Sequence, residues 1–90
     1  MSAVKIPSVL RPAVAGAREI DVEGSTIGEL IDALTRQHPS LRPQLLGDDG
    51  GLNRFVNVYV NGQDVRYLQG LETPVQERDE VRLLPAMAGG

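Results

Sequence analysis

The last six residues hold the least ordinary chemical group in this sequence. They read Pro85-Ala86-Met87-Ala88-Gly89-Gly90, so the final carboxylate follows two residues that have no Cβ atom. Because no side chain shields that carboxylate, a narrow channel in another protein could admit it. Six extended residues reach at most about 20 Å, which is enough to carry Gly90 into the active site of a partner. The pattern indicates an acyl group offered to other enzymes, although a frayed terminus is the usual fate of a chain end.

The rest of the sequence offers few groups for catalysis. There is no cysteine, which excludes disulfides, thiolate metal sites and a thiol nucleophile. We expect the single histidine, His38, to cap a helix rather than to bind a metal or act as a base. Asp48 and Asp49 lack the spacing of an EF-hand calcium loop. We therefore expect no metal site, no bound cofactor and no catalytic side chain in this chain.

The charge balance argues against two classes of partner. The 9 basic and 12 acidic residues give a formal net charge of −3 without any basic block, so nucleic acid is not expected. The acidic balance also disfavours anionic membranes, and no apolar run approaches the length of a membrane span. The N-terminus lacks the long apolar region of a signal peptide. We expect one small cytoplasmic domain that is a monomer when free.

Two alternating stretches near the N-terminus predict a β-hairpin. Residues 4–6 alternate apolar and polar side chains, and residues 18–22 do so again with Ile20 and Val22 on one face. Two prolines lie between the stretches, so the first strand is expected to be short or irregular.

An amphipathic helix is expected after the second strand. Thr26 and Glu29 match a capping box, in which the threonine hydroxyl accepts from the Glu29 amide and the carboxylate reaches back; Ser25 is an alternative cap. Behind the cap, four apolar side chains fall on one helical stripe: Ile27, Leu30, Ile31 and Leu34. His38-Pro39 ends the helix, because the residue before a proline avoids the α region.

The clearest local pattern predicts a second hairpin. Residues 54–60 alternate without a break, and the side chains expected to face the core are Val56, Val58 and Val60. Asn61-Gly62 follows, which is the leading two-residue hairpin signature because both turn residues need positive φ. Residues 81–84 are expected to form the final strand.

The element order predicts an α+β fold. One main helix with a single apolar stripe can cover one face of a mixed sheet of four to five strands. Pro85 lacks an amide hydrogen with which to continue the last strand. We therefore place the domain at residues 1–84 and a flexible C-terminal tail at residues 85–90.

Length, element order and motifs resemble the ubiquitin-like sulfur carriers of the ThiS/MoaD family, whose fold is the β-grasp. The resemblance covers nearly the whole chain and rests on the valine-rich strand with Asn61-Gly62 and on the C-terminal Gly-Gly. Within the family, the sequence is most similar to the carriers that serve cysteine synthesis. The residues behind this closer resemblance are Ile6-Pro7, Leu10-Arg11-Pro12, residues 54–57, 59–61 and 64–66, Leu84-Pro85-Ala86 and Ala88-Gly89-Gly90.

The resemblance implies a carrier protein that is a substrate of enzymes and not itself an enzyme. A ubiquitin-activating-type enzyme would use ATP to adenylate Gly90, and sulfur would then replace AMP to give a thiocarboxylate. A pyridoxal-phosphate cysteine synthase would take that sulfur, and a metalloprotease would release the cysteine. The tail residues that would enter these active sites are Pro85, Ala86, Met87, Ala88 and Gly89. Alternatively, the sulfur serves molybdopterin or thiazole synthesis, or Gly90 is joined to lysines as a protein modifier.

Three apolar side chains form the predicted docking surface for these partners. Phe55 and Tyr59 are expected to face away from the core valines, with Leu84 beside them. Exposed apolar side chains that gather in this way mark protein interfaces. The alternative is that they only cover the edge of the sheet.

Overall fold

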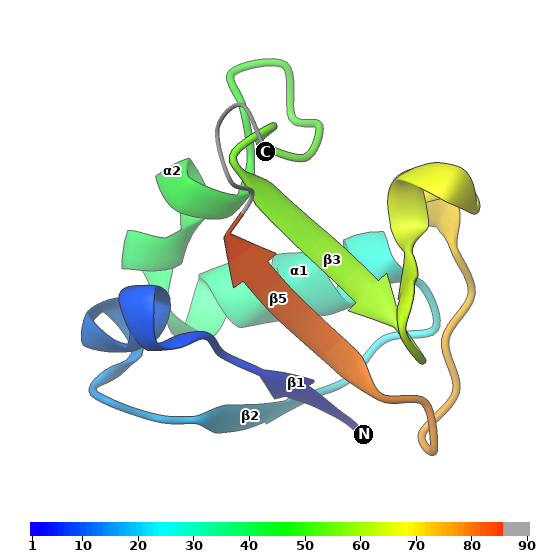
Figure 1. Cartoon of the computed structure of the whole chain (residues 1–90). Helices are drawn as coiled ribbons and strands as arrows, with labels where there is room; N and C mark the ends of the chain where they lie inside the picture. Colours follow the sequence, from blue (N-terminus) through cyan, green and yellow to red (C-terminus); the bar gives the residue numbers. More distant parts are fainter. Residues whose placement is uncertain (86–90) are drawn as a thin grey trace.

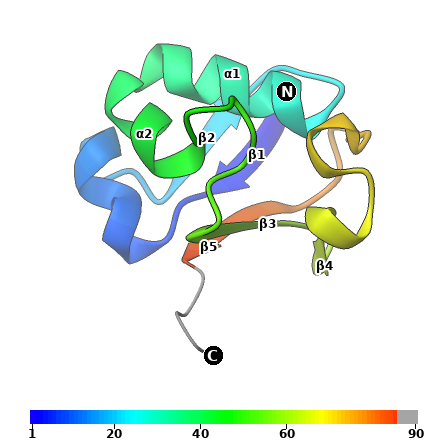
Figure 2. The same ribbon diagram turned by 90° about the horizontal axis from the view of Figure 1, so that it is seen from above.

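A mixed five-stranded sheet, with the strand order β2-β1-β5-β3-β4, organises the chain in the computed structural model, which describes residues 1–85 (Figure 1). The strands are β1 (Ser2–Lys5), β2 (Glu19–Val22), β3 (Val56–Val60), β4 (Gln63–Asp64) and β5 (Val81–Pro85). The helices α1 (Ile27–Gln37) and α2 (Arg42–Leu45) lie on one side of the sheet (Figure 2). The pair β1–β5 is parallel and the other pairs are antiparallel. The predicted α+β class with one main helix is confirmed.

The first hairpin forms as expected, but its connection is helical. A 3-10 helix, η1 (Ser8–Val14), fills the loop between β1 and β2, and the Ile6 amide donates to the Arg18 carbonyl at 2.8 Å. Ala15 and Gly16 end η1 with φ angles of 56° and 82°, in the left-handed region. Pro7 is the N-cap of η1 and has an extended backbone, whereas Pro12 lies inside the helix, where its fixed φ is already helical.

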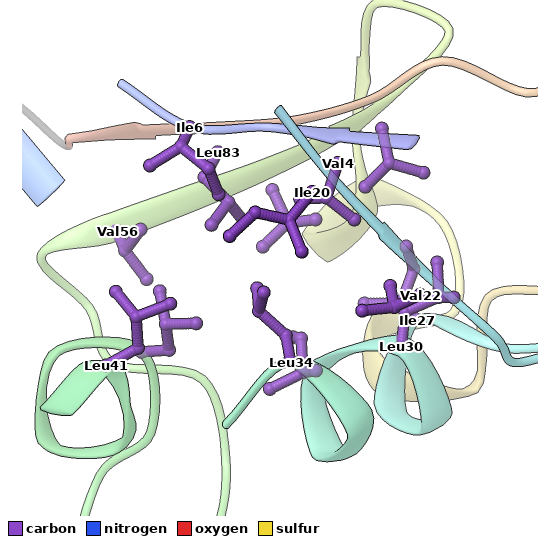
Figure 3. Close-up of a cluster of buried hydrophobic side chains, with 14 of the residues drawn as sticks. Val4, Ile6, Ile20, Val22, Ile27, Leu30, Leu34, Leu41, Val56 and Leu83 are labelled. Carbon is purple, nitrogen blue, oxygen red and sulfur yellow. The ribbon is translucent and has the colours of Figure 1, made fainter. Parts of the chain in front are cut away.

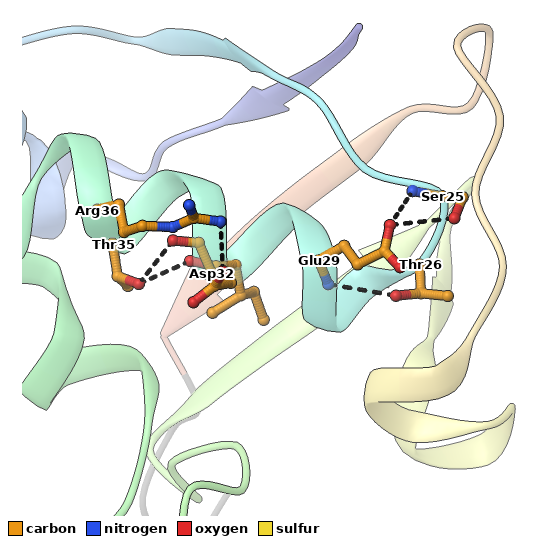
Figure 4. Close-up of polar contacts among 7 residues, drawn as sticks. Ser25, Thr26, Glu29, Asp32, Thr35 and Arg36 are labelled. Carbon is orange, nitrogen blue, oxygen red and sulfur yellow. Dashed lines mark hydrogen bonds and ion pairs between the residues drawn. The ribbon is translucent and has the colours of Figure 1, made fainter.

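The capping box at the start of α1 differs from the expected one by a single residue. The Glu29 amide donates to Thr26 Oγ1 at 3.2 Å, as predicted (Figure 4). The Glu29 carboxylate accepts from the Ser25 amide at 2.9 Å and the Ser25 hydroxyl at 3.0 Å. These bonds hold the pKa of Glu29 below its usual range, with the backbone bond contributing most. The carboxylate therefore reaches one residue beyond the cap residue itself.

The predicted helical stripe forms the centre of the core (Figure 3). Ile27, Leu30 and Leu34 are at most 1% exposed and pack against the inner face of the sheet. After α1, a 3-10 turn, η2 (Pro39–Leu41), leads into α2. Leu41 and Leu45, one from each of these elements, are completely buried. The helical layer thus covers one face of the sheet and leaves the other open.

The second hairpin has the predicted turn, but β3 starts two residues later than expected. Asn61 and Gly62 have φ angles of 52° and 85°, as a type I′ turn requires. The expected start at residue 54 is wrong, because residues 54 and 55 form a turn. Asn53 closes that turn: its carbonyl accepts from the Val56 amide at 3.1 Å and its side chain from the Phe55 amide at 2.9 Å.

The segment between β4 and β5 is irregular, and hydrogen bonds tie it to the start of α1. It contains η3 (Val65–Tyr67) and η4 (Gly70–Glu72). The Ile27 amide donates to the Thr73 carbonyl at 3.0 Å, and the Val75 amide donates to the Ser25 carbonyl at 2.9 Å. Among residues 1–85, no helix has both the length and the apolar character to cross a membrane.

Candidate functional site

The described part of the chain ends on β5, the central strand of the sheet. β5 pairs with β1 on one side and with β3 on the other, and Pro85 is paired with Val56 in the register. The sheet therefore extends one residue beyond the domain boundary expected at Leu84. Proline is tolerated there because its missing N–H falls at the end of the strand. Residues 86–90, which include Met87 and the predicted attachment site Gly90, lie outside the described part of the chain.

The two faces of β5 carry different side chains. Val81 and Leu83 face the helices and are 2% and 1% exposed. Leu84 points to the open face, where it is 36% exposed. The register pairs Tyr59 with Arg82 and Asn57 with Leu84. Tyr59 and Leu84 are therefore diagonal neighbours on the open face, within reach of one another.

Phe55 does not belong to this face in the way that the sequence suggested. It lies in the turn before β3, it is 59% exposed, and the Arg54 guanidinium lies 5.4 Å from its ring centre. It lines an open groove of about 320 Å³ together with Val9, Leu10, Pro43, Gln44, Asn53, Val56 and Pro85. Two separate apolar features thus flank the base of the tail: Leu84 with Tyr59 on the open face, and the groove at Phe55. Docking of partners on either feature stays a prediction.

Arg66 supports the open face, and sequence reasoning missed it. Its guanidinium donates to the Asn57 side-chain oxygen and to the Asn53 carbonyl, both at 2.8 Å. Asp64 positions the backbone of Arg66 by accepting from its amide at 2.8 Å. No periodic pattern links Arg66 with residues that precede it by 9 and 13 positions, so the sequence alone carried no signal.

Asn61 has a second role beyond its turn. Its side-chain oxygen accepts from the Glu80 amide at 2.9 Å, and its side-chain nitrogen donates to the Asp79 carboxylate at 3.0 Å. The bond from Asn61, and next the one from the Gln76 amide, hold the pKa of Asp79 below its usual range. One hairpin residue thereby fixes the chain where β5 begins.

No metal centre is present in the described part of the chain. Residues 1–85 contain no group of three or more His, Asp or Glu side chains placed to hold a metal ion.

Comparisons with known proteins identify a family and relatives that match nearly the whole chain. The model of the ThiS family matches residues 4–90. The chain is 40% identical over 89 residues to the sulfur carrier protein CysO of Mycobacterium tuberculosis, a match that covers 97% of this chain and 96% of CysO. It is 39% identical over 80 residues to small archaeal modifier protein 1 of Haloferax volcanii, which covers 86% of this chain and 87% of that protein.

The fold agrees equally well with a solved structure. A chain in the crystal structure of the Amycolatopsis orientalis BexX/CysO complex superposes with a TM-score of 0.90 at 39% identity, and the match covers 100% of both chains. This agreement confirms the predicted ubiquitin-like β-grasp fold, and the relatives found by sequence include both a sulfur carrier protein and a small archaeal modifier protein. Because the family model spans nearly the whole chain and the relatives match along the same length, this protein belongs to the ThiS family.

Proposed function

We propose that this protein is a sulfur carrier whose C-terminal Gly90 becomes a thiocarboxylate that donates sulfur for cysteine biosynthesis. The observation that carries the proposal is the 40% identity to CysO along 97% of this chain, within a family match that continues to residue 90. The fold supports the proposal, since the central strand β5 ends at Pro85, directly before the last five residues. Five extended residues reach at most about 18 Å, enough to enter a partner's active site.

The chemistry needs only the terminal carboxylate from this chain. A carboxylate oxygen of Gly90 attacks the α-phosphorus of ATP and displaces pyrophosphate, which leaves an acyl adenylate. Sulfide then attacks the carbonyl carbon, and AMP departs with the attacking oxygen. The product is a thiocarboxylate with a nucleophilic sulfur. A ubiquitin-activating-type enzyme supplies the catalytic groups for both steps.

The second stage transfers the sulfur to a three-carbon acceptor. A pyridoxal-phosphate cysteine synthase would present an acceptor formed from an activated serine by loss of its activating group, and the thiocarboxylate sulfur would then bond to the β-carbon of that acceptor. The resulting thioester lies next to the amine of the new cysteine. Acyl transfer from sulfur to nitrogen gives a more stable amide, and a metalloprotease then hydrolyses that amide to release cysteine and regenerate Gly90. The BexX/CysO complex supports the expectation that such carriers bind partner proteins.

Intact mass spectrometry tests the proposal directly. The thiocarboxylate form is mixed with a cysteine-synthase-type enzyme and an activated serine, and we expect the carrier to gain one cysteine residue, mapped after Gly90. The matched control is the plain carboxylate form, which should stay unchanged. Recovery of unmodified carrier with an enzyme that is competent on another carrier, together with sulfur transfer to a molybdopterin or thiazole precursor, would move the assignment to those pathways.

A second candidate is a protein modifier joined through Gly90 to lysines of target proteins. The 39% identity to small archaeal modifier protein 1 over 86% of this chain favours it. The distinguishing measurement is peptide mass spectrometry of the tagged carrier after purification from its native cells. Lysine side chains carrying the C-terminal glycine would support the modifier, whereas carrier found only with a free carboxylate, thiocarboxylate or added cysteine supports the first function.

A further inference from the structure

A groove of about 420 Å³ opens where β1 and β5 run past the start of η1, away from the Phe55 groove. Four of its lining residues are basic and one is acidic: Lys5, Arg11, Arg18, Arg82 and Glu19. The chain has 9 lysines and arginines against 12 acidic residues, so the remaining surface holds 5 basic and 11 acidic side chains. A protein with net charge −3 thus concentrates nearly half of its positive charge in one concavity.

Arg11 lies in η1 and Arg18 lies just before β2, and neither forms an ion pair in the described part of the chain. Among residues 1–85, neither Arg11 nor Arg18 has a carboxylate within 4.0 Å, whereas Glu80 lies 3.5 Å from Lys5 and 3.3 Å from Arg82. Arg11 donates through Nε to the Ile6 carbonyl at 3.1 Å, which orients its guanidinium and leaves the two terminal nitrogens for a ligand. Guanidinium groups held in this way match carboxylates in a bidentate geometry.

The sheet register brings like charges together at the same place. Lys5 on β1 is directly opposite Arg82 on β5, and its other neighbour is Glu19 on β2. Like charges directly opposite one another destabilise a sheet, and Glu80, which contacts both Lys5 and Arg82, offsets part of this repulsion. Tyr59 is the next residue along the same cross-strand row. Arg82, which lines the basic groove, is therefore the direct cross-strand neighbour of Tyr59.

We propose that this basic groove docks an acidic segment of the partner proteins that receive the C-terminal tail. The proposal rests on the proposed function only for the identity of those partners. Carboxylates of the segment pair with Arg11 and Arg18, while the apolar side chains beside β5 contact the partner nearer its active site. Arg82 precedes Gly90 by eight residues, so the segment docks within about 28 Å of the partner's catalytic centre.

The test uses a hexaglutamate peptide and the isotope-labelled full chain, followed by amide chemical shifts at low salt. We expect the largest shifts at the backbone amides of Lys5, Arg11, Arg18 and Arg82. The variant R18E/R82E should bind the peptide at least about 10-fold more weakly, since two of the four basic side chains that line the groove are reversed in charge. The control R42E/R78E has the same net charge but alters exposed arginines outside the groove, and it should change the affinity less than about 3-fold.

Two results would overturn the proposal that the basic groove docks an acidic segment. Equal losses in the two variants would show that net charge alone governs binding, which overturns it. Tighter binding of inorganic phosphate than of hexaglutamate at matched concentration would identify a simple anion site and also overturn it. Urea unfolding checks that R18E/R82E is folded, and R18Q/R82Q, which only removes charge, should give an intermediate affinity. A chain lacking Gly90 should bind hexaglutamate with the same affinity as the full chain. The result of this test therefore does not depend on the sulfur chemistry.

Discussion

The two faces of β5 perform different tasks with alternate residues of one strand. Val81 and Leu83 face the helices and are almost completely buried, while Arg82 and Leu84 point to the open face. The inner residues hold the strand in the centre of the sheet, and the outer ones surround the base of the tail. The comparison teaches that the two-residue period of one strand separates residues that hold the core from exposed residues, which we expect to serve recognition.

Alanine substitutions at Leu83 and Leu84 should show the largest difference in unfolding free energy between the two faces. Leu83→Ala opens a cavity in the core and should lower the free energy of unfolding by about 2–5 kcal/mol. Leu84→Ala removes the same atoms from a site that is 36% exposed and should cost about 1 kcal/mol or less. Urea unfolding of both variants measures the difference. Equal costs would mean that the open face is packed as tightly as the helical one.

A charge on the open face should affect binding more than stability. We expect Tyr59→Asp to weaken binding to the adenylating partner about 10-fold, which is about 1.4 kcal/mol, with a smaller loss in unfolding free energy. Phe55→Asp is the informative companion because Phe55 lines a separate groove and not the open face. Calorimetric binding and urea unfolding of both variants show which feature docks. Large unfolding losses with unchanged affinity would make both side chains structural.

Removal of the α1 cap tests the helical side without touching the sheet. Thr26→Ala deletes the acceptor for the Glu29 amide and should cost about 1 kcal/mol in unfolding free energy. Thr26→Ser keeps the hydroxyl and serves as the control, so it should stay close to the wild type. If alanine and serine give the same stability, the Glu29–Ser25 bonds alone hold the helix start.

The smallest expected effect is a pH dependence from Asp79. Its pKa is lowered in the folded state by Asn61 and Gln76, so its contribution to stability is present above the pKa of the unfolded chain. That contribution is lost as the pH falls through about 4 and below. Asp79→Asn should be slightly less stable at neutral pH and should lose less stability on acidification. Thermal unfolding between neutral and acidic pH measures both; parallel curves for the two proteins would contradict this origin.

Local patterns predicted the elements whose partners are near in sequence. The stripe on α1 and the Asn61-Gly62 turn depend on residues at most seven positions apart, and both appear as expected. The helical form of η1 was not predicted, because its prolines fit either an extended or a helical chain. Phe55 was misplaced because the alternation in the sequence begins two residues before the true start of β3. There, the hydrogen bonds of Asn53 form a turn.

Features that depend on register could not be read from the sequence. The basic groove brings residues 5, 11 and 18 next to residue 82 only because β1 and β5 pair in parallel. The bonds from Arg66 to Asn57 and Asn53 likewise depend on the turn of the chain into η3. By contrast, the attachment site predicted at Gly90 required no register, since that prediction rested on Gly89-Gly90 and not on contacts between strands.

The central claim is that the free carboxylate of Gly90 is the reacting group. The most direct measurement is ATP-dependent adenylation by a ubiquitin-activating-type enzyme, followed as pyrophosphate exchange, on three proteins: the wild type, a chain lacking Gly90, and a chain with one alanine added after it. We predict exchange with the wild type only, while all three proteins unfold at the same urea concentration. An adenylate that forms equally well on the extended chain would contradict the account.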